Sequence, residues 1–207
     1  MSIRSALVST ARSSLLLCAL CATACASSGE SPSTVKENAA MTANSTLAEP
    51  AGLTAQDLSE RVLKLIQSVH GIADLAPDKL RETTGLPIVV HSANDYGANG
   101  PVTGVWYYGL RSMSPDAASV PNRVLFELSD QSDSDADMSP VCVPVETYEK
   151  TLVSAGFSSK KLRNRHDTQD YWEFTRGKVG ATVYVRGKSH PADAQTCVSM
   201  VIVETAV

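Results

Sequence analysis

Apolar residues after residue 50 first recur at helical spacing and later gather in short runs typical of strands. Between residues 55 and 70 they lie three or four positions apart, at Leu58, Val62, Leu65, Ile66 and Val69. Thr54 and Asp57 form a capping-box pattern at the start of this run, so we expect an amphipathic helix over residues 55–70. A second, short helix is expected over residues 77–84, which begin with a proline and are followed by a glycine.

From residue 86 onward, short runs of β-branched and aromatic residues are separated by Gly, Pro, Asn and Asp. The strands expected in this part are residues 88–92, 102–113 and 122–129. After an acidic loop the order recurs, with a helix expected at 144–155 and strands at 159–165, 171–176, 181–186 and 196–204. The pattern predicts an α+β domain with an antiparallel sheet and helices packed on one face. It also suggests two α-then-β blocks, although no residue-level repeat supports a duplication.

The first 24 residues have the parts of a bacterial signal peptide. Arg4 and Arg12 supply positive charge, an apolar run of about ten residues begins at Leu15, and small residues follow it. Such a run is too short to span a membrane, which takes about 20 apolar residues. We therefore expect a signal peptide over residues 1–24 and export of the rest to the periplasm.

Residues 22–25 resemble the lipobox of bacterial lipoproteins, in which small residues precede a cysteine that is acylated and becomes the new N-terminus. That family prefers leucine where Ala22 stands, and ordinary cleavage after Ala26 is the alternative. The resemblance implies a lipid anchor on Cys25. The lack of an aspartate directly after this cysteine implies sorting to the outer membrane. Residues 25–50, rich in Ser, Thr, Ala and Pro, are expected to be a flexible tether.

Residues 51–207 are expected to form a single globular domain, which keeps two cysteines, Cys142 and Cys197. Export places them in an oxidising compartment, where two remaining cysteines usually pair. We expect a disulfide between them, with two unrelated buried thiols as the alternative. Closing a loop of this length would contribute roughly 4 kcal/mol.

The charge balance narrows the classes of partner. The chain has 18 basic and 22 acidic residues, and loss of Arg4 and Arg12 with residues 1–24 leaves 16 against 22, a net charge of −6. A general nucleic-acid binder would be basic, so no nucleic-acid partner is expected. Membrane contact is expected through the lipid anchor only.

No local motif in the sequence indicates an enzyme, a metal or a cofactor. The four histidines do not pair at metal-ligand spacing, and no HExxH, CxxC or GxSxG pattern is present. Catalysis by residues distant in sequence stays open, because such triads leave no local motif. We expect a protein that is not an enzyme and that binds no cofactor.

The densest acidic segment carries Asp133, Asp135 and Asp137. The spacing is superficially that of a calcium loop, but Met138 stands where the turn glycine is needed and Pro144 where the bidentate glutamate belongs. A solvated acidic loop is the preferred interpretation, and such a loop could contact a basic partner.

A second candidate partner surface is the segment 94–101, interpreted as a Gly- and Asn-rich loop, with the three aromatic residues at 106–108. At least one aromatic side chain of a strand should face outward, because side chains alternate between faces. The candidate partner-binding residues are Asp95, Tyr96, Asn99 and Tyr107. In the alternative, Trp106 and Tyr108 are core residues and Tyr107 is an ordinary half-exposed sheet residue.

In leader, tether, size and α+β pattern the chain resembles the small periplasmic immunity lipoproteins that proteobacteria encode beside secreted antibacterial effectors. No motif in the domain carries this resemblance, so it implies no site residue. It implies that the partner is an effector enzyme, a cell-wall or lipid hydrolase, inhibited by steric occlusion. The alternatives are an envelope-assembly or structural lipoprotein that binds an outer-membrane complex or peptidoglycan, and a periplasmic hydrolase.

Overall fold

Helices and strands follow one another in two similar runs in the computed structural model, which describes residues 52–116, 119–134, 136–163, 170–186 and 196–206. All of these residues belong to one compact unit, Leu47–Val207. The first run comprises α1 (Ala55–Ser68), η1 (Ile72–Leu75), α2 (Pro77–Thr84), β1 (Val89–Ser92), β2 (Asp95–Thr103), β3 (Trp106–Met113) and β4 (Arg123–Asp130). The second comprises η2 (Ser139–Val141), α3 (Val145–Ser154), β5 (Ser158–Arg163), β6 (Asp170–Arg176), β7 (Val179–Arg186) and β8 (Cys197–Thr205).

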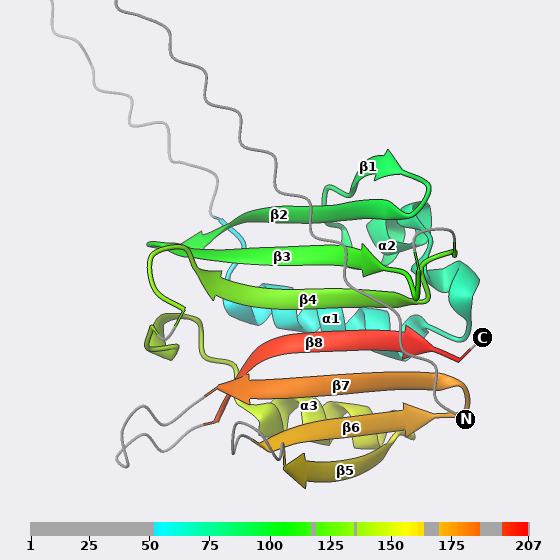
Figure 1. The fold of residues 1–207 in the computed structure, drawn as a ribbon. Coiled ribbons are helices and arrows are strands. Elements are labelled where there is room, and N and C mark those ends of the chain that lie inside the picture. The colour runs from blue at the N-terminus through cyan, green and yellow to red at the C-terminus, as the bar shows by residue number, and fades with distance from the viewer. Residues whose placement is uncertain (1–51, 117–118, 135, 164–169, 187–195, 207) are drawn as a thin grey trace, which may run out of the picture. The chain divides into compact units, whose positions relative to one another are not determined.

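The strands form one eight-stranded sheet in the order β1-β2-β3-β4-β8-β7-β6-β5 (Figure 1). Every neighbouring pair is antiparallel. The last strands of the two runs, β4 and β8, pair at the centre of the sheet, with Phe126 opposite Val201. The expected α+β class is confirmed, and the two α-then-β blocks meet through their final strands.

The start of α1 shows why its sequence forms a helix. The Asp57 backbone N–H donates to Thr54 Oγ1 at 3.1 Å, and the Thr54 backbone N–H donates to Asp57 Oδ2 at 3.0 Å. These two bonds satisfy donors that a helix N-terminus would otherwise leave unpaired. The hydrogen bonds also hold the pKa of the Asp57 carboxyl below its usual value. The capping box predicted from the sequence is therefore confirmed.

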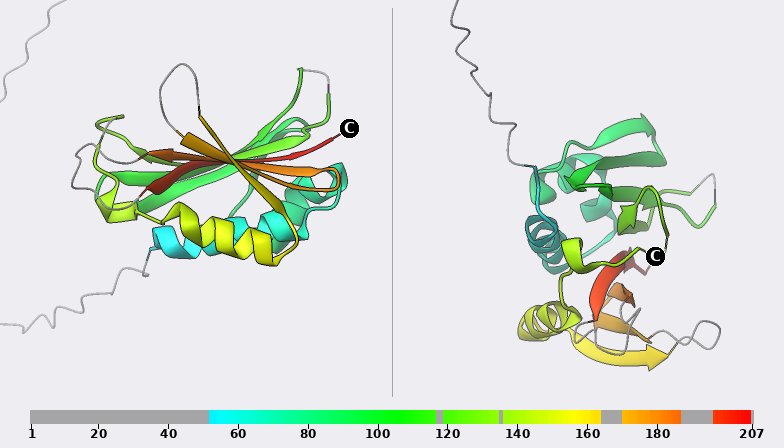
Figure 2. Two further views of the ribbon diagram at one scale, coloured as in Figure 1. Left: turned by 90° about the horizontal axis from the view of Figure 1, so that it is seen from below. Right: turned by 90° about the vertical axis from the view of Figure 1, so that its left-hand side faces the viewer.

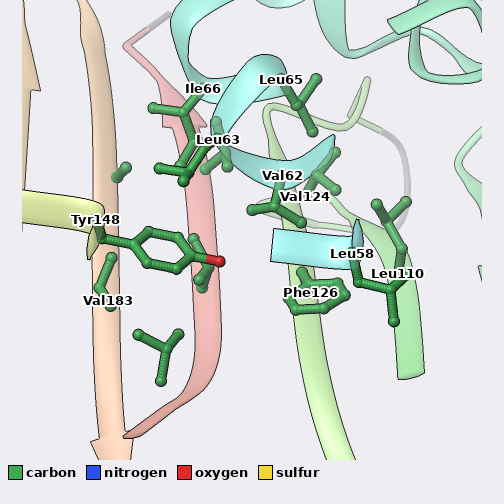
Figure 3. Packing of buried hydrophobic residues seen from close by; sticks show 14 of the residues in the cluster. Leu58, Val62, Leu63, Leu65, Ile66, Leu110, Val124, Phe126, Tyr148 and Val183 are labelled. Atoms are coloured by element: carbon green, nitrogen blue, oxygen red, sulfur yellow. The ribbon is translucent and has the colours of Figure 1, made fainter. Parts of the chain in front are cut away.

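Helices α1 and α3 lie on the same face of the sheet (Figure 2). Apolar side chains fill the space between these helices and the strands (Figure 3). Leu58 and Val62 of α1 are buried with Phe126 of β4, and Tyr148 of α3 is fully buried with Val183 of β7. Full burial of one such side chain contributes about 1.5–3 kcal/mol. The opposite face of the sheet carries no helix among the described residues.

One stretch differs from the sequence prediction. Residues 94–101, expected as a loop, belong largely to β2, and the strand expected at 102–113 is interrupted by a turn at Gly104, whose φ is 55°. The glycines of this stretch allow close packing rather than a turn. A Cβ on Gly97 would lie 2.2 Å from the Leu110 carbonyl oxygen, and one on Gly100 would lie 2.9 Å from the Tyr108 ring. Glycine occurs both in turns and where two backbones approach closely, so the glycines alone could not distinguish a loop from a strand here.

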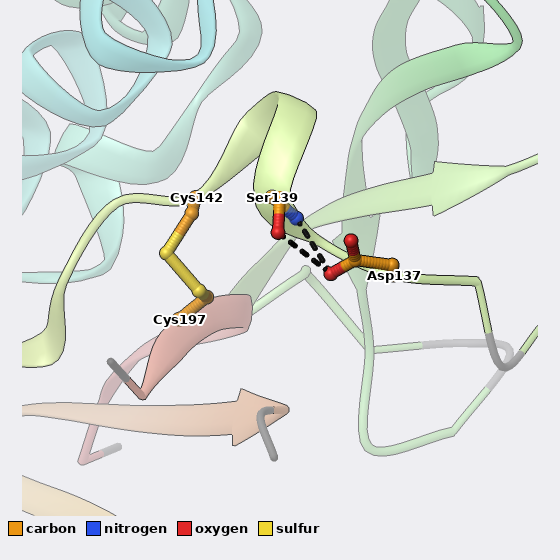
Figure 4. Close-up of a disulfide and its surroundings, with 4 residues drawn as sticks. All are labelled: Asp137, Ser139, Cys142 and Cys197. Carbon is orange, nitrogen blue, oxygen red and sulfur yellow. Dashed lines mark hydrogen bonds between the residues drawn. A yellow bond between two sulfur atoms is a disulfide. The ribbon is translucent and has the colours of Figure 1, made fainter. Parts of the chain in front are cut away.

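The predicted disulfide is present between Cys142 and Cys197, whose Cα atoms are 5.0 Å apart (Figure 4). It joins the segment before α3 to the first residue of β8. Backbone hydrogen bonds reinforce this junction, from Val145 N–H to the Thr196 carbonyl at 3.1 Å and from Val198 N–H to the Val143 carbonyl at 2.9 Å. The disulfide therefore ties the segment before α3 to the start of β8, the strand through which the second block pairs with β4.

Within the described residues, no helix has the length and apolar character needed to cross a membrane. The expected signal peptide, Cys25 and the tether lie outside the described residues.

Candidate functional site

The face of the sheet opposite the helices bears the candidate site. Alternation along β3 buries Trp106 and Tyr108 against the helices and leaves Tyr107 39% exposed on the other face. This confirms the interpretation in which Trp106 and Tyr108 are core residues. Tyr107 is therefore available for contact with a partner.

A groove of about 780 Å³ lies on this open face over the β1–β4 half of the sheet. Its polar lining includes Asp95, Asn99, Tyr107, Arg111, Glu127 and Ser129. Apolar residues, among them Pro87 and Val89, line the rest of it, and a mostly apolar hollow with a few convergent polar groups is a common form of binding site.

The floor of the groove includes a glycine. Gly109 of β3 lies between Asn99 of β2 and Glu127 of β4 in one row across the sheet, and the Glu127 side chain lies over it, with Cγ 3.5 Å from where a Cβ would stand. Through Met200 of β8 the same row continues into Tyr184 of β7 and Tyr171 of β6, whose rings stack with centroids 5.5 Å apart. The first half of the sheet therefore carries an acidic side chain over a glycine where the second half carries aromatic rings.

The charges of the groove are acidic in balance. Two carboxylates, Asp95 and Glu127, and one guanidinium, Arg111, line it, which gives a net charge of −1 with neutral histidine. Among the described residues, none of the three side chains has an ion pair within 4.0 Å or a side-chain hydrogen bond to a protein group. These groups are therefore available to a ligand.

Four of the residues selected from the sequence line this groove. Asp95 and Asn99 come from β2 and Tyr107 from β3, which pairs with it. The fourth, Tyr96, also borders the groove, but its side chain is only 3% exposed and leaves little surface for a partner. Its hydroxyl donates to the Leu75 carbonyl at 2.9 Å, and burial raises its pKa. Side chains alternate between the two faces of a strand. Tyr96 lies between Asp95 and Gly97, which face the open side, so its side chain points to the core.

Of the acidic segment after β4, the described residues Asp133 and Asp137 are not among those that line the groove. Asp137 accepts hydrogen bonds from the Ser139 backbone N–H at 3.0 Å and the Ser139 hydroxyl at 2.8 Å (Figure 4). It therefore stabilises the start of η2. Asp133 lies on the same exposed connection, and Asp135 lies outside the described residues.

Sequence reasoning missed Arg111, Glu127 and Ser129. The signal for Glu127 was present, because it alternates with the core residues of its strand. Arg111 could be placed only by recognising that β2 and β3 form a hairpin, which sets it opposite Gly97. Its contribution to the groove depends on that pairing.

No group of three or more His, Cys, Asp or Glu side chains suited to a metal ion occurs within the parts of the chain that the structure describes.

No family model, curated protein or solved structure matches this chain. The groove is therefore interpreted from its own residues, as a candidate binding surface that combines apolar lining with a net negative charge and the exposed Tyr107.

Proposed function

We propose that this protein is a lipid-anchored periplasmic immunity protein that binds a secreted antibacterial effector, a cell-wall or lipid hydrolase, and inhibits it by steric occlusion. The observation that carries the proposal is the groove on the open face of the sheet. Its exposed Tyr107 and its unpaired Asp95, Arg111 and Glu127 form a site for a protruding segment of another protein.

The energetics of protein interfaces support this use of the groove. Tyrosine and arginine are enriched among the residues that contribute most to binding, especially where surrounding contacts exclude water. Tyr107 and Arg111 line the same hollow. A standard interface covers about 800 Å² on each partner, so the sheet surface around the groove would also take part.

The sequence supports the location. The leader would direct export, and acyl chains on Cys25, two of which suffice for stable anchoring, would hold the domain at the membrane. A tether of residues 26–50 would let the domain meet an effector that enters the periplasm.

The proposal is tested by growth in competition. A strain that lacks the gene should lose survival beside kin that deliver the effector, and should grow normally in monoculture. An envelope defect in monoculture would instead indicate a housekeeping lipoprotein that binds an outer-membrane complex or peptidoglycan. Unchanged survival beside kin would contradict the immunity function.

A further inference from the structure

The edge strand β1 has one side without a paired strand among the described residues. It stands at one end of the sheet and pairs only with β2 among the described strands. All four of its residues are exposed, and Val89 and Val90 are 54% and 51% exposed. Strand edges with apolar side chains are templates for pairing with another chain.

The opposite edge of the sheet is built differently. Strand β5 carries Lys160, Lys161 and Arg163, and the Lys161 ammonium lies 2.7 Å from a carboxylate oxygen of Asp170. Charged side chains, lysine above all, are a common means by which edge strands avoid pairing. Strand β1, with the sequence Val-Val-His-Ser, carries no lysine or arginine, so its edge is limited only by its length of four residues and by the register shift between Val90 and Ser92.

The exposed edge is continuous with the groove. Val89 and His91 of β1 line the groove together with Asp95 of the neighbouring strand. Val89 lies opposite Gly97 on the open face, whereas Val90 lies opposite the buried Tyr96 and so faces the helix side. A strand placed beside β1 would direct every second side chain toward the groove and the others toward Val90.

We propose that β1 is the docking edge for an extended segment of a protein partner, which adds a strand to the sheet and brings a basic side chain to Asp95. This inference rests on the proposed function, because it names the part of the effector that the site receives. The segment would carry β-branched or other apolar residues opposite the two valines and a lysine or arginine on the groove side. Such strand addition combines main-chain hydrogen bonds with side-chain specificity.

Charge complementarity selects this occupant. The groove has a net charge of −1 and the chain without residues 1–24 one of −6, which favours a basic segment. A second copy of the chain is a poorer fit, because a second β1, with the sequence Val-Val-His-Ser, would bring no lysine or arginine to Asp95.

The test is an NMR titration of the full exported chain with the peptide acetyl-Thr-Arg-Val-Thr-Val-Arg-Val-Thr-amide. The control peptide has both arginines replaced by glutamate. We expect the basic peptide to shift the backbone amide signals of β1 and β2 and to bind at least tenfold more tightly than the acidic one.

Three variants make the test specific. The double substitution Val89→Ser/Val90→Ser removes the apolar edge without adding charge and should weaken binding about tenfold. Val153→Ser on α3 removes a valine of similar exposure, 48%, and should leave binding unchanged. Asp95→Asn should remove most of the preference for the basic peptide.

The inference would be overturned by saturable shifts that map to β5 or to the helix face, by equal affinity for both peptides, or by no shift at millimolar peptide. The titration needs no cognate effector. A negative titration would therefore overturn strand addition at β1 without contradicting the immunity function, which the competition assay tests. A negative competition assay would contradict the immunity function without changing the titration result.

Discussion

At the scale of single residues, the contact between Tyr148 and Ser59 shows how one polar pair is accommodated in the core. Tyr148 is fully buried, and its hydroxyl donates to Ser59 Oγ at 3.0 Å, joining α3 to α1. Substitution Tyr148→Phe would leave the buried Ser59 hydroxyl without this donor. We expect the free energy of unfolding to fall by about 1 kcal/mol, measured by urea denaturation. The matched control, Tyr107→Phe, changes an exposed ring and should leave stability unchanged.

Because Tyr148 is buried, the free energy of unfolding should fall as the pH becomes alkaline. Burial raises the pKa of Tyr148 well above the usual value of about 10, because the charged phenolate is poorly solvated in the core. The folded state therefore holds this proton more tightly than the unfolded state. The stability from this group is complete below about pH 10 and is lost as pH rises further. Urea midpoints between pH 8 and 11 should fall more steeply for the wild type than for Tyr148→Phe, and parallel curves would contradict the assignment.

At the scale of elements, Arg176 joins the ends of both long helices to the β6–β7 turn. Its guanidinium donates to the Gln67 carbonyl at 2.7 Å and to the Ala155 carbonyl at 3.3 Å, and it lies 4.4 Å from the centre of the Phe157 ring. A cation is favourable at helix C-termini, where carbonyls lack partners. We expect Arg176→Ala to reduce the free energy of unfolding by about 2–3 kcal/mol, measured by urea denaturation.

The control for Arg176 is Arg123, which pairs with Glu204 across the centre of the sheet at 3.0 Å. Both side chains of this pair are more than 40% exposed. Solvent screens such pairs, so Arg123→Ala should cost less than about 1 kcal/mol. Equal losses for the two variants would show that Arg176 has no special part in joining the helices.

The disulfide between Cys142 and Cys197 holds the segment before α3 against the start of β8. It closes a loop with a sequence separation of 55 residues, which would stabilise the fold by roughly 4 kcal/mol in the chain-entropy model. The double substitution Cys142→Ser/Cys197→Ser should lower the urea midpoint of oxidised protein by a corresponding amount. Reductant should lower the wild-type midpoint similarly and leave the variant unaffected. A wild-type midpoint insensitive to reductant would contradict this role.

The elements that the sequence predicts well are those whose determinants are local. The capping box at Thr54 and the alternation at Val124, Phe126 and Leu128 specify a helix start and a strand within a few residues. Strand β2 escaped prediction because its Gly97 and Gly100 meet residues of β3 that lie more than five positions away. The groove depends on the same pairing of β2 with β3. Some of its residues could therefore be selected from the sequence, but not the fact that they line one groove.

At the scale of the whole molecule, the two blocks join through β4 and β8 and use the faces of their common sheet differently. One face is buried under α1 and α3, and side chains of these helices and of the strands form the core. The other bears the groove over the first block and stacked tyrosines over the second. In the proposed function, this division lets the core hold the fold while the open face receives the effector.

The measurement that tests the account most directly is rescue of kin competition by groove variants in the strain that lacks the gene. Tyr107→Ala/Glu127→Lys changes the exposed anchor and reverses a groove charge, whereas Val153→Ser on α3 changes an exposed residue outside the groove. At equal protein levels, the wild type and Val153→Ser should restore survival and the groove variant should not. Full rescue by the groove variant would contradict the account.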